Sequence, residues 1–66
     1  MKRKDGKQRY IVLVTVSMTH EDGHVETKSN DFDFYSDDPE RYLERYRNRL
    51  MWFGWHHVEF GKIREV

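Results

Sequence analysis

The chain has 66 residues, of which 36% are hydrophobic, 36% charged and 15% aromatic. This length allows one small domain with a single core, and the aromatic content argues against disorder. The absence of cysteine excludes disulfides, thiolate zinc sites and cysteine nucleophiles. No apolar run approaches the ~20 residues that a membrane span needs, and no secretory leader is visible. We therefore expect a cytoplasmic protein that does not associate with a membrane.

The charges sum to zero, but they are segregated along the chain. Residues 1–9 carry an excess of four positive charges, residues 21–40 an excess of seven negative charges and residues 41–66 an excess of three positive charges. Such segregation serves solubility, folding or the steering of a partner. Residues 1–9 contain almost no apolar side chain, so we expect them to form a disordered basic leader before a single domain over residues 10–66.

A β-hairpin is predicted after the leader. Tyr10–Thr19 is a β-branched, alternating strand whose first half is apolar on both faces, as is typical in the middle of a sheet. The Asp-Gly turn that follows allows a two-residue loop, which a bulge near Ser29 would support, or a three-residue loop that pairs His20 with His24. We choose the longer loop because it places the aromatic residues of the second strand opposite the apolar face of the first.

In that register Val12 lies opposite Phe32, and Tyr10 lies opposite Phe34. The second strand runs from about His24 to Tyr35, and its first half is polar at nearly every position. Because the helix that follows is shorter than this hairpin, we expect residues 17–28 to project beyond the core.

A helix is predicted to begin at Asp38, with Pro39 in the first helical position, and to run to Phe53 before Gly54. No alanine occurs in the chain, so packing rather than intrinsic propensity must stabilise the helix. Its apolar stripe consists of Tyr42, Leu43, Tyr46, Leu50 and Phe53.

The last strand contains a break. Val58 and Phe60 alternate inward, and Gly61 interrupts the alternation so that Ile63 returns to the core, which suggests a bulge. The element order β-β-α-β with a right-handed crossover predicts an α+β fold: a three-stranded antiparallel sheet of order 2-1-3 with one helix on one face. The expected centre of the core is Phe32, Phe34, Tyr46, Leu50 and Phe60.

Candidate metal ligands are the four histidines. His20 and His24 face each other across the turn and could hold a divalent ion, but we favour the interpretation that they are polar residues flanking the turn, since two imidazoles on an exposed tip rarely form a closed site. His56 and His57 point to opposite faces of one strand, so they cannot share an ion through it. We expect no bound metal and no cofactor.

Catalytic residues are not indicated by the sequence. Asp31 and Asp33 share one sheet face, where paired carboxylates beside a histidine could perform acid–base chemistry. No positioned nucleophile, oxyanion loop or glycine-rich phosphate cradle accompanies them. We therefore expect that the protein is not an enzyme, and that these acids keep an uncovered sheet face soluble or belong to an interface.

The predicted partner-binding residues are Arg41, Arg45, Arg49 and Trp52 on the exposed side of the helix. Arginine and tryptophan are enriched at binding hot spots, and arginine also binds phosphate bidentately. A partner would therefore have an acidic surface, while a solvated face that pairs only with acids of the chain is the competing interpretation. The open edges of the second and third strands are further candidates for strand addition, although Lys62 and Arg64 would guard the latter.

Residues from Tyr35 to about Phe60 resemble the small inhibitor of bacterial RNA polymerase made by phage T7. The similarity lies in Tyr35-Ser36, the acidic helix start, Leu43-Glu44 and the aromatic residue after Gly54. It implies a strand–strand–helix–strand domain that binds and blocks a larger host protein. No functional residue is transferred, because the basic residues of that inhibitor's last strand have no match in register.

Three hypotheses for the function follow. The first is a small non-enzymatic protein-binding module, a phage-type inhibitor acting in the host cytoplasm and monomeric rather than oligomeric. The second is a nucleic-acid binder that uses the basic leader and the helix arginines, although zero net charge weakens it. The third is a computationally designed fold without biological function, which the Asp-Pro-Glu helix start, the Asp-Gly turn and the absence of cysteine and alanine would suit.

Overall fold

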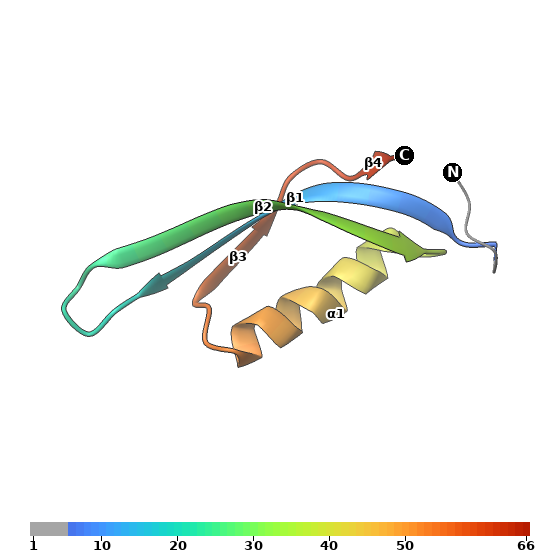
Figure 1. The fold of residues 1–66 in the computed structure, drawn as a ribbon. Helices are drawn as coiled ribbons and strands as arrows, with labels where there is room; N and C mark the ends of the chain where they lie inside the picture. Colours follow the sequence, from blue (N-terminus) through green and yellow to red (C-terminus); the bar gives the residue numbers. More distant parts are fainter. Residues whose placement is uncertain (1–5) are drawn as a thin grey trace.

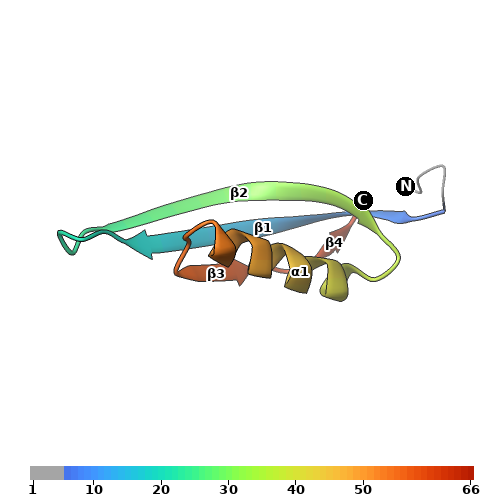
Figure 2. The same ribbon diagram turned by 90° about the horizontal axis from the view of Figure 1, so that it is seen from below.

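The computed structural model describes residues 6–66 and has the α+β architecture that the sequence predicts (Figure 1). The antiparallel sheet has the order β2-β1-β3, and a short β4 also pairs with β1. One helix covers one face of this sheet (Figure 2). The elements are β1 (Gln8–Thr19), β2 (Val25–Ser36), α1 (Pro39–Trp52), β3 (His57–Phe60) and β4 (Arg64–Glu65).

The hairpin adopts the predicted three-residue loop. The backbone N–H of His20 donates to the carbonyl of His24 at 2.8 Å, and the N–H of Gly23 donates to the carbonyl of His20 at 2.9 Å. Gly23 has a φ of 89°, a left-handed conformation that glycine adopts without strain. Val12 pairs with Phe32, as predicted from the match of apolar faces.

The last strand is interrupted where the sequence indicates a bulge. Between the pair Val14–Phe60 and the pair Ile11–Arg64, β1 advances three residues while the last strand advances four. One extra residue is therefore accommodated, and it divides the expected third strand into β3 and β4. Gly61 lies close to β1 at this point: its N–H donates to the carbonyl of Leu13 at 2.8 Å, and a Cβ at this position would lie 3.4 Å from the Cβ of Leu13.

The start of β1 differs from the sequence prediction. The strand begins at Gln8 rather than Tyr10, so residues 8 and 9 belong to the sheet and not to a disordered leader. Arg9 is held there because its carbonyl accepts from the N–H of Val66 at 3.1 Å and its guanidinium pairs with Asp33. Of the remainder of the predicted leader, residues 6 and 7 are exposed and precede the strand, and residues 1–5 lie outside the described residues.

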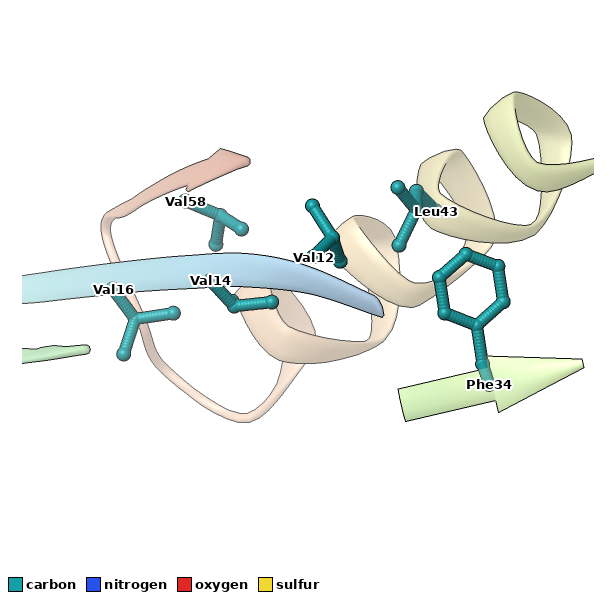
Figure 3. Close-up of a cluster of buried hydrophobic side chains, with 6 residues drawn as sticks. All are labelled: Val12, Val14, Val16, Phe34, Leu43 and Val58. Atoms are coloured by element: carbon teal, nitrogen blue, oxygen red, sulfur yellow. The ribbon is translucent and has the colours of Figure 1, made fainter. Parts of the chain in front are cut away.

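The core centre predicted from the sequence is only partly right (Figure 3). Phe34 is buried, but the other four predicted residues are half-buried and pack around the cluster. The middle strand is covered by its two neighbours and by the helix, and its residue Val12 is the most deeply buried of the cluster. The buried hydrophobic residues are Val12, Val14, Val16, Phe34, Leu43 and Val58.

Phe53 was expected on the apolar stripe of the helix, but it is 67% exposed. The chain reverses at Gly54, whose φ is 116°, and the N–H of Trp55 then donates to the carbonyl of Leu50 at 3.3 Å. Trp55 packs against the core instead. The tertiary turn, rather than the helical period, decides which aromatic side chain is buried.

The molecule is elongated, with extents of 47 × 18 × 15 Å. The hairpin projects beyond the helix, because β3 pairs with β1 only as far as Ser17 (Figures 1 and 2). Its tip, residues 21–25, is exposed at every position. Among the described residues, no helix is long and apolar enough to cross a membrane.

Truncation of Leu43 should destabilise the protein more than truncation of Leu50. Leu43 is buried, whereas Leu50 is half-buried at the rim. Leu43→Ala is expected to lower the free energy of unfolding by about 2–5 kcal/mol, and Leu50→Ala by less. Met51→Ala, at an exposed helix position, should stay within about 0.5 kcal/mol. Chemical denaturation measures all three, and a larger loss for Leu50 than for Leu43 would show that the core is centred elsewhere.

Candidate functional site

A groove of about 720 Å³ opens between α1 and the carboxyl end of β2. Three of the four predicted binding residues line it, so we name it the arginine groove. Its lining includes Arg41, Arg45, Arg49, Tyr35, Tyr42 and Tyr46. The lining is completed by Lys7, Ser36, Asp37 and Asp38. The groove therefore combines a line of cations with aromatic rings.

The start of the helix is fixed by hydrogen bonds from both sides. Asp38 is the N-cap, and its carboxylate accepts from the backbone N–H of Arg41 at 3.3 Å. The N–H of Asp38 donates in turn to the hydroxyl of the buried Ser36 at 2.9 Å. These bonds set the position of the first arginine relative to β2, and the four-residue spacing then aligns the other two on the same side of the helix.

Stacked aromatic rings attach the helix to β2 beneath the groove. The ring of Tyr42 lies 4.7 Å from that of Phe34, and the ring of Tyr46 lies 4.2 Å from that of Phe32, both nearly parallel. Such pairs contribute about 0.5–1.5 kcal/mol each beyond their buried area. The helical period predicts both tyrosines as core residues, yet Tyr42 is 40% exposed and both rings also border the groove.

The three arginines of the groove are not neutralised by acids of the chain. Within residues 6–66, none of them forms an ion pair. The competing interpretation, in which they pair with Glu40, Glu44 or the acidic second strand, is therefore not supported.

A fourth helix arginine behaves differently. Arg47 donates to the carbonyl of Val58 at 3.1 Å, and its guanidinium lies over the ring of Phe60. It joins the helix to β3 on the side away from the arginine groove. The sequence alone did not separate this structural arginine from the three that line the groove.

Trp52 lies outside the groove. It is 82% exposed, and its ring meets that of Phe53 edge to face at 5.6 Å. Met51 beside them is 47% exposed. The end of the helix thus presents a small apolar surface, separate from the residues that line the groove.

Two acids of β2 are paired with arginines of β1 and β4. The guanidinium of Arg9 binds Asp33, with its Nε donating at 2.9 Å, and Arg64 lies 3.9 Å from Asp31. The hydrogen bond from Arg9 lowers the pKa of the Asp33 carboxyl below its ordinary value. Asp33 is therefore held ionised and paired, which does not favour a role as a general acid.

The rings of His20 and His24 are stacked with their centroids 4.5 Å apart, but each ring is paired with a different carboxylate. His20 Nε2 lies 2.9 Å from Glu26, and His24 Nδ1 lies 3.2 Å from Asp22. The bond to His20 lowers the pKa of the Glu26 carboxyl. In the part of the chain that the structure describes, no group of three or more potential ligands converges on one point.

Comparison with protein-family models, curated proteins and solved structures finds no match to this chain. The similarity to the phage inhibitor of RNA polymerase stays a prediction. The functional argument therefore rests on the geometry and the charges of the site.

The Arg9–Asp33 pair predicts a pH dependence of stability. Because the pKa of Asp33 is lowered from its ordinary value of 3.8 on folding, the pair stabilises the folded state above that value. This contribution is lost as the pH falls through the lowered pKa. Urea denaturation between about pH 2 and pH 6 should show that Asp33→Asn reduces this acid-dependent loss. A constant stability difference between wild type and variant over that range would contradict the pairing.

Proposed function

We propose that the chain is a small non-enzymatic protein-binding module whose arginine groove takes an acidic segment of a larger protein. The observation that carries the proposal is the line of Arg41, Arg45 and Arg49, which lacks ion-pair partners within the described residues and lies beside the rings of three tyrosines. Charge-assisted hydrogen bonds to carboxylates are about twice as strong as neutral ones, and arginine makes them bidentately.

The placement of the arginines on a helix favours binding. Their backbone positions are fixed by the N-cap and by the tyrosine stacks, so a partner orders only the ends of the side chains. The positive groove also attracts an acidic partner before contact, which raises the association rate at low salt. A phage-type inhibitor that blocks a larger host protein, working in the host cytoplasm, would use such a surface.

Nucleic acid is the second candidate, because guanidinium groups bind phosphate and tyrosine rings can stack on bases. The charge distribution opposes it. Asp37 and Asp38 lie at one end of the groove, and residues 21–40 carry an excess of seven negative charges. We therefore favour an acidic protein segment over a phosphate backbone.

Charge reversal in the groove tests the proposal. The protein carrying Arg45→Glu and Arg49→Glu should bind an acidic partner at least about 100-fold more weakly, since each of the two lost charge-assisted bonds contributes about 1.5–3 kcal/mol. Capture from bacterial lysate, followed by mass spectrometry and titration of the captured protein, gives the affinities. Circular dichroism verifies that the variant is folded.

The control is Lys62→Glu, which reverses the charge of an exposed residue outside the groove and outside the ion pairs of residues 6–66. It should retain binding within about threefold, in keeping with the small effect of rim charges. Equal binding by the groove variant and wild type would exclude this surface. A groove variant that loses only duplex DNA, with no protein captured, would favour the nucleic-acid function. Capture of nothing by any form would favour a fold without a biological partner.

A further inference from the structure

β2 forms a long open edge of the sheet next to the arginine groove. The order β2-β1-β3 places it outermost, and no other strand of residues 6–66 pairs with its far side. It extends for twelve residues without a break. The opposite edge consists of a four-residue and a two-residue strand separated by the bulge. An uninterrupted edge of this length is a template for pairing with another chain.

The register identifies the backbone groups that point outward. His20 donates to His24, so in this antiparallel hairpin the even-numbered residues of β2 exchange hydrogen bonds with β1. The other side of β1 gives independent support, because the carbonyls of Leu13 and Ser17, both odd-numbered, accept from the last part of the chain. The N–H and C=O groups of Ser29, Asp31 and Asp33 therefore point to the open edge.

The helix and the edge strand have matching spacings. Phe34 stacks on Tyr42 and Phe32 stacks on Tyr46, so two residues along β2 correspond to four residues along α1. Two strand residues advance about 6.6 Å and four helix residues about 6 Å. A strand added along β2 would therefore present one side chain to each successive arginine of the groove.

We propose that the acidic segment binds as an added β-strand on the open edge of β2. Its acidic side chains at every second position lie on the helix face of the sheet and pair with Arg41, Arg45 and Arg49. Its intervening side chains lie on the other face, beside Asp31 and Asp33, and are therefore not acidic. This inference rests on the proposed function and gives the sequence pattern of the ligand: acidic residues alternating with neutral or basic ones.

Two synthetic peptides of equal composition test the pattern. One alternates glutamate with threonine over about twelve residues, and the other gathers the same glutamates into one block. Fluorescence anisotropy at low salt should show that the alternating peptide binds at least tenfold more tightly. Binding should be lost in the protein carrying Arg45→Glu and Arg49→Glu and retained in the control carrying Lys62→Glu.

Backbone methylation of the peptide tests the strand itself. In an antiparallel strand the amides that face β2 belong to the threonines, because residues opposite the odd-numbered positions share their face. N-methylation of the threonines should weaken binding at least tenfold, and N-methylation of the glutamates should change it less than threefold. The reverse sensitivity would indicate a parallel added strand. On the protein, hydrogen exchange of the Asp31 and Asp33 amides should slow at least tenfold on binding.

The outcomes separate the two proposals. Strand addition would be overturned if both peptides bound with equal affinity in an arginine-dependent manner, or if N-methylation of neither the threonines nor the glutamates weakened binding. The proposal that the groove binds an acidic ligand would survive either result. Failure of both peptides to bind, or binding unaffected by the groove variant, would overturn the proposed function as well. A single-stranded DNA of similar length that binds more tightly than either peptide, in an arginine-dependent manner, would replace the peptide ligand with nucleic acid.

Discussion

The stacking of two helix tyrosines on two phenylalanines of the edge strand determines the arrangement of the other surfaces. Tyr42 on Phe34 and Tyr46 on Phe32 hold α1 along β2 with matched spacing. The apolar side of the helix then covers the valines of β1, and the arginines border the groove beside the edge. One set of contacts therefore contributes to the core and also positions the candidate binding surface. A domain of this size buries only about 60% of the surface of its unfolded chain, so few buried contacts are available for either role.

The segregation of charge along the sequence has a structural counterpart. The acids of the hairpin are paired locally, Asp33 with Arg9 and Glu26 with Lys28. Since the strands supply these basic partners themselves, the helix arginines are not needed to neutralise β2. The net charge of zero thus conceals a positive groove, so the total charge does not describe the charge of the candidate site.

Strand order, hairpin register and helix start were predictable because each depends on a local pattern. Double-sided apolarity placed β1 in the middle, and the match of Val12 with Phe32 selected the loop length. Alternation reveals the face of a residue but not its depth, so half-buried Phe60 was placed at the centre of the core. The groove depends on how the helix packs against β2. Helical spacing alone therefore grouped Trp52 with the arginines, although it lies outside the groove.

The central claim is that the groove selects its ligand by charge from an extended segment, and a charge-swap titration tests it most directly. The protein carrying Arg45→Glu and Arg49→Glu is titrated with a peptide that alternates lysine with threonine, and wild type serves as the reference. The account predicts that the variant binds this basic peptide at least tenfold more tightly than wild type does. Equal affinity of the two proteins for the basic peptide would contradict it, because the groove charges would then have no part in recognition.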